Sequence, residues 1–330
     1  MTGCGGLYLQ QGVDEGTEIA SLMSWANAGG PGAENYSRMP AHPRFDRAAR
    51  ALAANMLEAG AESEALDGVF KDAGRYVCAM WAMYAHVSGG LTLPRLKEIC
   101  AASGLLSPGR ARALLLYLRY LGYVESAGRD NNRVVRYTPT QDFIRSWRRH
   151  FRAALDAARV VEPAVDLVLN RLEEQPVFET LARFQGEEFL AATRGATATD
   201  TPYFRVFLNR HAGQQIAMLF GAEGSGAFPT RETIAFSSAA TAKRFRVSRV
   251  HIKRMLDHAQ REGFLVRNAD GTVVLRESLR DAVRESYAIQ LTRLLSQTAR
   301  TVREKPELLS QCEMSARRML PSAVVTASVI

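Results

Sequence analysis

The sequence predicts a mainly α-helical protein in which two similar segments each combine a pair of helices with a two-stranded β-hairpin. Three observations lead to this fold class. Apolar residues recur at helical spacing over most of the chain, two distant segments share one pattern, and convincing short strands occur only in those two segments. With 330 residues and 47% hydrophobic content, the chain is long enough for two globular domains.

Composition narrows the class of protein further. The four cysteines (Cys4, Cys78, Cys100 and Cys312) are scattered and form no CxxC pair, which argues against a zinc cage or a disulfide framework and fits a reducing cytoplasm. The N-terminal MTGCGGLYLQQG lacks the features of a signal peptide, and no apolar run approaches the roughly 20 residues that a membrane helix needs. We therefore expect a cytoplasmic protein that involves no membrane, metal or cofactor.

The first part of the chain is predicted to be disordered and then helical. Residues 1–43 are rich in Gly, Pro, Ser and Asn, a composition typical of disorder. One helix is predicted from Arg44 to Gly60, and a second covers Glu64 to His86, where apolar residues have helical spacing. A long basic helix is predicted over Gln141–Ala158, after the first of the two similar segments.

The second part of the chain is also predicted to be helical. Helices open at Pro163 and Pro176, because proline is tolerated in the first turn of a helix. Further helices are predicted near Phe204–Phe220 and from about residue 276 to 303. The predicted domains are a disordered segment at 1–43, a first domain at 44–160, a helical connector at 161–203, a second domain at 204–303 and a C-terminal tail at 304–330.

The two similar segments align at a fixed offset of 141 residues. Ser107 then falls on Ser248, each placed to N-cap a helix, and Gly122 falls on Gly263, each placed as the left-handed residue that ends it. Four apolar positions within each helix also superpose, and they lie within about 100° of one another on a helix of 3.6 residues per turn. These predicted buried stripes are Ala111, Leu114, Leu115 and Leu118 in the first helix and Ile252, Met255, Leu256 and Ala259 in the second.

Both aligned helices are flanked by the same kinds of element. A shorter helix precedes each one, with the sequences LPRLKEICAASG and SSAATAKRF. A strand follows each one directly (Tyr123–Glu125 or Phe264–Val266), then a polar turn and a return strand, VVRY or TVVL. Such agreement between two separate stretches is unlikely to arise by chance.

This order of elements resembles the winged helix-turn-helix of DNA-binding regulators. The segment GYVESAGRDNNRVVRYTPTQDFI is more specifically similar to the MarR family, which shows a Gly, an apolar pair, a charged wing with Asp and Arg, and a Thr leading into a helix. The resemblance covers residues 75–160 and 204–300. It implies a cytoplasmic, nucleoid-associated transcriptional regulator that binds double-stranded DNA as a monomer or homodimer. MarR-like chains usually carry one such unit and dimerise, so a chain with two is expected to act as its own pseudo-dimer.

Positive charge is concentrated in the two segments. Residues 88–137 hold eight Arg or Lys against three acids, and residues 237–276 hold nine against three, whereas the whole chain is only +8. Charge at this density, as in KRFRVSRVHIKR at 243–254, normally meets a polyanion. The basic residues therefore lie where a winged helix would contact phosphate.

In the second segment, we expect Arg249 and Lys253 to contact bases, because they occupy the first turns of the capped helix. Arg244, Arg246 and Arg267 are expected to contact the DNA backbone. The predicted DNA-binding residues of this segment are Lys243, Arg244, Arg246, Ser248, Arg249, His251, Lys253, Arg254 and Arg267.

The first segment is predicted to contact DNA through fewer side chains. Arg112 is the preferred base contact, and Leu116 and Tyr120 are predicted to pack on neighbouring helices instead of contacting bases. Wing residues are expected to reach a minor groove. The candidates are Ser107, Arg110, Arg112, Arg129, Asn131, Asn132 and Arg133. A structural or dimerising role for this segment is the alternative.

The sequence also contains a feature typical of some enzymes. GAEGSG at 221–226 is similar to a cofactor-binding turn, but no βαβ unit is predicted around it, so a flexible loop is preferred and no enzymatic activity is expected. A plasmid-type replication initiator with tandem winged helices is one alternative, which direct repeats beside the gene would favour. A protein-interaction scaffold is the other, which a lack of DNA binding even at low salt would favour. The operator, the effector ligand and the choice between activation and repression stay open.

Overall fold

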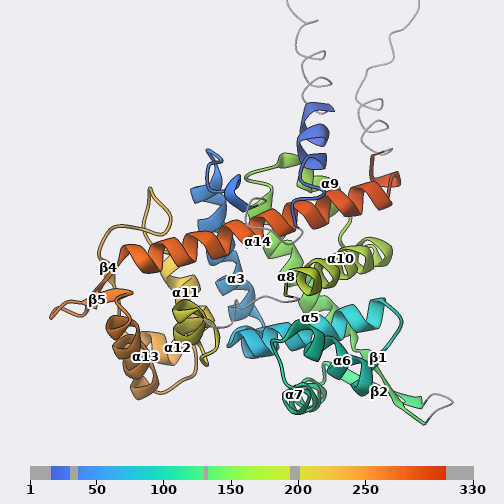
Figure 1. Ribbon diagram of the computed structural model, residues 1–330, viewed down its shortest axis with the longest axis horizontal. Helices are drawn as coiled ribbons and strands as arrows, with labels where there is room; N and C mark the ends of the chain where they lie inside the picture. Colours follow the sequence, from blue (N-terminus) through green and yellow to red (C-terminus); the bar gives the residue numbers. More distant parts are fainter. Residues whose placement is uncertain (1–15, 30–35, 130–132, 194–200, 310–330) are drawn as a thin grey trace, which may run out of the picture.

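The structure is a computed structural model that describes residues 16–29, 36–129, 133–193 and 201–309. It is mainly helical, with two small three-stranded antiparallel sheets. Figure 1 shows the long helix α14 (Glu277–Glu304) crossing the molecule from end to end. Of the helices in these ranges, none is long and apolar enough to span a membrane.

Two helices were predicted over residues 44–86, and the structure has three in this part of the chain. α3 (Phe45–Glu62) follows the predicted helix, but the next predicted helix is divided into α4 (Glu64–Phe70) and α5 (Ala73–Val87). Asp72 N-caps α5, because its Oδ1 accepts a hydrogen bond from the backbone N–H of Arg75 at 2.9 Å. The prediction of one continuous helix is wrong here.

The first unit, which we define as α5 to α8, contains a short strand, two helices, a hairpin and a long helix. After α5 its elements are β1 (Leu91–Thr92), α6 (Leu93–Ser103), α7 (Pro108–Tyr120), β2 (Val124–Arg129), β3 (Val135–Pro139) and α8 (Gln141–Ala158). Thr140 N-caps α8, since its hydroxyl accepts from the backbone N–H of Phe143 at 3.4 Å. The bounds of α8 are those that the sequence predicted.

A helical connector joins the two units. Its elements are η1 (Pro163–Val165), α9 (Asp166–Leu169) and α10 (Gln175–Thr193). Helical structure therefore begins at Pro163, as predicted, and Pro176 lies in the first turn of α10.

The second unit, which we define as η3 to α14, repeats the order of the first. Its elements before α14 are η3 (Phe204–Leu208, π-helical), α11 (Gly213–Ala222), β4 (Ile234–Ala235), α12 (Ser238–Arg244), α13 (Arg249–Arg261), β5 (Leu265–Arg267) and β6 (Thr272–Leu275). The helix predicted over 204–220 is interrupted between η3 and α11. A Cβ on Gly213 would lie 2.0 Å from the carbonyl oxygen of Phe207, so the close approach at this break requires glycine.

Each sheet has a third strand that the sequence did not predict. The strand orders are β1-β3-β2 and β4-β6-β5, and all pairs are antiparallel. Leu91 pairs with Tyr137 in the first sheet, and Ile234 pairs with Val273 in the second. The two hairpins are confirmed, but each sheet is three-stranded because a strand of two residues joins it from before the helix pair.

The structural repeat extends beyond the predicted one. After each hairpin the chain is held by the same backbone hydrogen bond, from Thr140 N–H to the Tyr123 carbonyl (2.9 Å) and from Arg276 N–H to the Phe264 carbonyl (2.8 Å). A long helix begins at the next residue in both units. The repeated unit therefore includes α8 and α14 as well as the helix pair and hairpin.

Part of the N-terminal segment is ordered, although the sequence predicted disorder over 1–43. Residues 16–23 are helical, and Leu22, Trp25 and Met39 are at most 2% exposed. The Ser21 hydroxyl donates a hydrogen bond to the Glu162 carboxylate at 2.6 Å. The prediction is wrong for these stretches, because contacts with distant elements outweigh the local composition. Residues 1–15 and 30–35 lie outside the described ranges.

One hydrophobic core runs through both units. The buried cluster is continuous from Leu22 to Leu308 and includes side chains from every predicted domain. α14 packs against α10 and α3, and α3 packs against α8 and α11. The predicted boundaries at 160 and 203 therefore do not separate independent cores. The predicted tail at 304–330 also contributes to the core through Leu308, and its residues from 310 onward lie outside the described ranges.

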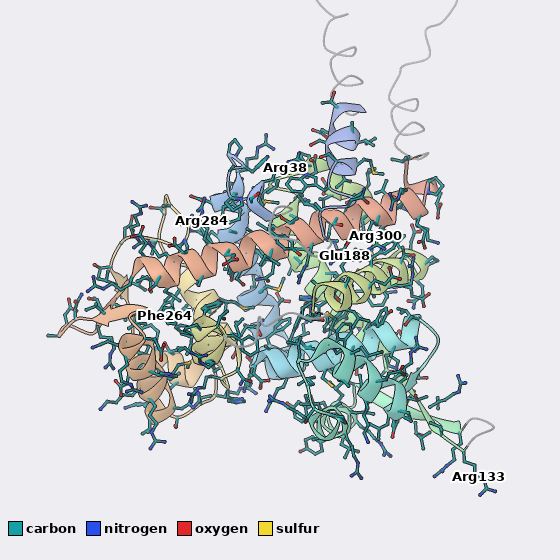
Figure 2. The ribbon with its side chains drawn as sticks, viewed as in Figure 1. Arg38, Arg133, Glu188, Phe264, Arg284 and Arg300 are labelled. Atoms are coloured by element: carbon teal, nitrogen blue, oxygen red, sulfur yellow. The ribbon has the colours of Figure 1, made fainter. Side chains whose placement is uncertain are left out.

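A buried carboxylate lies between α10 and α14. Glu188 is 4% exposed and accepts hydrogen bonds from Ser296 Oγ (2.7 Å), Gln297 Nε2 (3.1 Å) and Arg300 Nη1 (3.3 Å). Figure 2 shows Glu188 and Arg300 facing each other across the two helices. Burial raises the pKa of Glu188, and the hydrogen bonds oppose this effect only in part.

We expect Glu188→Gln to change how stability depends on pH. Because the folded-state pKa is raised, protonation of Glu188 favours folding. That stabilisation is fully present below the unfolded pKa of about 4.3 and is lost as pH rises through the folded value. Urea unfolding should thus show the wild type gaining stability relative to the variant as pH falls from about 7 to 4. Identical pH profiles for the two proteins would contradict the assigned burial.

Candidate nucleic-acid interface

Helix α13 has one buried and one exposed face, as the sequence predicted. Ser248 N-caps the helix by accepting a hydrogen bond from the backbone N–H of His251 at 3.1 Å, and Gly263 follows its end with φ of 72°. All four residues of the predicted stripe are buried. Arg249, Lys253 and Arg254 are exposed on the other side.

The acidic residues at 237–276 do not neutralise the charges of Arg249, Lys253 and Arg254. Asp257 pairs with Arg267, and Glu262 lies 3.4 Å from His258. Asp270 accepts from the backbone N–H of Thr272 within the hairpin turn. Across the described part of the chain, no carboxylate forms an ion pair with Arg249, Lys253 or Arg254. The exposed face of α13 therefore has an unbalanced positive potential.

The turn before α13 adds further positive charge. Lys243 and Arg244 are exposed in the last turn of α12, and the Arg244 guanidinium lies 5.5 Å from the centre of the Phe245 ring. Arg246 is exposed in the turn, where its φ of 52° gives the left-handed conformation that closes the connection. All three residues lie directly before the N-terminus of α13, and Arg244 and Arg246 are two of the three predicted contacts to the DNA backbone.

Arg267 is placed differently from the other cations. Its Nη2 pairs with Asp257, and its Nε donates to Gln260 Oε1 at 3.3 Å. Within the protein, its charge is matched by a carboxylate of α13, and the pair holds the hairpin against the helix. Its contact with the DNA backbone stays a prediction.

His251 also has a partner within the protein. Its Nε2 donates to the carbonyl oxygen of His211 at 2.7 Å, and the side chain is half-buried. The sequence suggested a DNA contact for this residue, but the ring attaches α13 to the segment before α11. Among the described residues, no group of His, Cys, Asp and Glu could hold a metal ion.

Helix α7 of the first unit has the same caps but a different outer face. Ser107 accepts from the backbone N–H of Arg110 at 3.3 Å, and Gly122 follows the helix with φ of 71°. Arg112 is exposed, as predicted. Arg110 Nη2 lies 3.4 Å from Asp72 Oδ1, so part of its charge is matched by the cap of α5. In the predicted stripe, Ala111, Leu115 and Leu118 are buried and Leu114 is half-buried.

Two apolar side chains on α7 are exposed, contrary to prediction. Leu116 is 48% exposed and Tyr120 is 86% exposed, so neither is covered by a neighbouring helix. Arg119, which the sequence analysis did not single out, is exposed on the same face. Its spacing of seven residues from Arg112 was the signal that could have identified it.

The first hairpin extends away from the body of the protein. Arg129 and Arg133 are exposed, and Arg129 Nη1 donates to the Arg133 carbonyl at 3.2 Å, which draws the two strands together. Figure 2 shows Arg133 at the far end of the hairpin. Asn131 and Asn132, also predicted to contact DNA, lie outside the described residues.

Polar contacts hold the first turns of α7 and α13 against neighbouring segments of the chain. Arg110 of α7 pairs with Asp72, and His251 of α13 bonds to His211. Burial lowers the pKa of His211, and the positive charges of Arg75 and Lys71 lower it further. Neither contact was visible in the sequence, because Asp72 and His211 lie far along the chain from Arg110 and His251.

The glycine-rich segment at 221–226, predicted to be a flexible loop, begins in the last two residues of α11 and continues into the connection to β4. Arg50 fixes part of it by donating to the carbonyls of Gly226 (3.3 Å) and Ala227 (2.9 Å). All the paired strands that the structure describes are antiparallel, so this loop is not part of a βαβ unit.

Comparison of the chain with protein-family models, with curated proteins and with solved structures finds no match. No fold or activity is therefore carried over from a relative. The geometry of α7, α13 and their hairpins has to support any assignment of function.

Proposed function

We propose that the protein is a sequence-specific DNA-binding transcriptional regulator that uses two winged helix-turn-helix units as an intramolecular pseudo-dimer. The order of elements supports this. In each unit a helix, a short strand, two helices joined by a tight turn and a β-hairpin follow one another, with the short strand beside the second hairpin strand. A winged helix combines these elements around a helix that enters the major groove.

The observation that carries the proposal is the exposed face of α13. Arg249, Lys253 and Arg254 face outward without a carboxylate partner among the described residues, and Lys243 and Arg244 precede them. Grouping like charges costs free energy through repulsion unless a polyanion compensates it. Duplex DNA supplies such a partner along the whole length of this face.

The position of each basic residue on or before α13 suggests whether it contacts bases or phosphates. Arg249 and Lys253 lie in the first two turns of α13, where side chains reach base edges and can donate to guanine O6 and N7. Lys243, Arg244 and Arg246 flank the entry of the helix and would contact phosphates. In the first unit, Arg112 would be the equivalent donor, and Arg129 and Arg133 would contact DNA from the hairpin.

The arrangement of the two units supports the pseudo-dimer. Figure 1 shows α7 and α13 on the same side of α14, and the hairpins of the two units extend in different directions. The hydrophobic core is continuous through both units and includes the buried faces of α7 and α13, which favours a fixed arrangement of the two helices. One chain would therefore present two helices to one duplex in a single orientation.

The runner-up function is a protein-interaction scaffold, which one observation favours. Leu116 and Tyr120 expose apolar surface on α7, as residues of a protein-docking face do. A replication initiator is a variant of the main proposal, since it would use the same faces on repeated DNA sites.

Alanine substitutions on α13 test the proposal. A preferred site is first selected from random duplexes. Lys253→Ala and Arg249→Ala should each weaken binding to that site by about 1–3 kcal/mol and relax its sequence preference. Arg244→Ala should weaken binding to all sequences alike and reduce the slope of log affinity against log salt by about one. Fluorescence anisotropy at several salt concentrations measures both effects.

The matched control is Arg145→Ala, which removes one positive charge from α8, where Arg145 already pairs with Asp142 at 2.6 Å. It should leave affinity and preference close to those of the wild type. Absence of duplex binding by the wild type even at low salt would reject the proposal and favour the scaffold. An unchanged sequence preference in the Lys253 variant would show that α13 is not the reading helix.

A further inference from the structure

The exposed apolar residues of this protein are not scattered. Within the described residues, three large apolar side chains are exposed: Leu116 (48%), Tyr120 (86%) and Val250 (56%). All three lie on the outer faces of α7 and α13. Exposing them has no benefit for the free protein, so their location points to a ligand that covers these two faces.

The two outer faces differ in chemistry. At the offset of 141 residues, Arg112 and Ala113 of α7 correspond to Lys253 and Arg254 of α13, and Leu116 corresponds to Asp257. On α7, the residues at 112, 113, 116, 119 and 120 lie within a sector of about 120°. The face of α7 is thus apolar along its centre with arginines at one edge, whereas that of α13 is mainly cationic.

Charge decides what covers the apolar face of α7. A second copy docking there face to face would bring Arg112 and Arg119 of both copies together, in a segment that already carries eight basic residues against three acids. A polyanion removes this repulsion. The major groove of DNA is lined by phosphates and also displays apolar groups, which are the C5 methyls of thymine.

We infer that α7 reads thymine methyl groups through Ala113 and Leu116, so that the first unit selects a thymine-rich half-site while α13 selects guanine. This inference rests on the proposed function and adds to it the base composition of each half-site. Arg112 would keep its role as the base-edge donor of the first unit, and Arg119 would neutralise a phosphate along the edge of the groove. Tyr120, at the C-terminal end of α7, would donate its hydroxyl to a phosphate oxygen where the helix leaves the groove.

The second unit should show a weaker form of the same contact. Val250 is exposed in the first turn of α13, next to Arg249 and one turn before Lys253 and Arg254. Val250 can contact one thymine methyl group, while the three neighbouring basic side chains can donate hydrogen bonds to bases. The two halves of the site should therefore differ in composition.

Replacing thymine by deoxyuridine in one half-site at a time tests this inference with the full chain. Deoxyuridine keeps the base pair and O4 and lacks only the methyl group. Each contacted methyl that is removed in the first unit's half-site should lower affinity about fourfold, which corresponds to one buried methyl-sized group. Footprints of the Arg112→Ala and Lys253→Ala variants identify which half belongs to which unit.

The Leu116→Ala variant and the deoxyuridine substitution together form a double-mutant cycle, which measures the coupling between Leu116 and the thymine methyl group. Leu116 is half exposed, so its truncation should leave the melting temperature close to that of the wild type. In this variant, deoxyuridine at the base that Leu116 contacts should no longer lower affinity, because that methyl has lost its partner. Deoxyuridine at the base that Ala113 contacts should still lower it about fourfold. Arg145→Ala, which changes an exposed residue of α8 and leaves α7 intact, should keep the full fourfold loss of affinity.

The outcomes separate the inference from the proposed function. If the protein binds its site specifically and deoxyuridine in the first half has no effect, the methyl contact is absent and the DNA-binding function stands. If no specific duplex binding occurs and Leu116→Ala abolishes self-association in analytical ultracentrifugation, both the inference and the proposed function fail. The apolar face would then be an interface between copies of this chain.

Discussion

Met255→Asp is expected to unfold the second unit. Met255 is 3% exposed on the buried face of α13, and a carboxylate placed there would have no cationic partner in the core. An uncompensated buried charge costs about 3–5 kcal/mol, which is comparable to the entire stability of many domains. Because the core is continuous through both units, the loss should extend to the packing of α14. Thermal melting followed by circular dichroism measures this effect.

Arg254→Asp is the matched control for this substitution. Arg254 is the preceding residue of the same helix and is exposed, so the variant introduces the same carboxylate without burying it. Its melting transition should stay close to that of the wild type, whereas its affinity for DNA should fall through repulsion from phosphate. An undisturbed melting transition in the Met255 variant would show that the burial assigned to α13 is wrong.

The features that the sequence predicted correctly are those encoded by neighbouring residues. Ser107 and Ser248 cap helices that begin at the next residue, and Gly122 and Gly263 follow the ends of those helices in the left-handed conformation. Caps and apolar stripes act within one or two turns, so their pattern is visible in the sequence alone. The agreement between the two repeats strengthened each of these predictions.

The features that were missed depend on partners far away in the chain. β1 and β4 have two residues each and exist only because β3 and β6 lie beside them. Trp25 lies in a segment of disorder-like composition and is nevertheless buried in the shared core. No local sequence pattern predicts these short strands or the burial of Trp25, because the contacts that stabilise them form only once the chain has folded.

The candidate site was predictable as a concentration of charge but not residue by residue. Arg110, His251 and Arg267 look equivalent to their basic neighbours in the sequence. The structure gives each of them a partner within the protein, namely Asp72, the His211 carbonyl and Asp257. Tertiary contacts therefore distinguish these three residues from Arg249, Lys253 and Arg254, which have no carboxylate partner among the described residues.

Changing the distance between the two half-sites is expected to affect affinity more than any single substitution at the interface. The pseudo-dimer should recognise an imperfect inverted repeat whose half-sites are one helical turn apart, roughly 34 Å or 10 base pairs. Joining two binding units in one chain raises affinity by about 10²–10⁴-fold over either unit alone, and the gain is lost when geometry forbids simultaneous binding. Inserting about 5 base pairs turns the half-sites to opposite faces of the duplex and should remove that gain.

An insertion of about 10 base pairs distinguishes a rigid chain from two flexibly joined units. It restores the half-sites to one face, but at twice the distance. The continuous core, which includes the buried faces of both helices, is expected to hold α7 and α13 in one arrangement, so the protein should not recover its affinity. Footprinting together with native mass spectrometry should show one chain across both half-sites of the original repeat. A single chain that protects only one half-site, or binding that requires two chains, would show that only the second unit reads DNA.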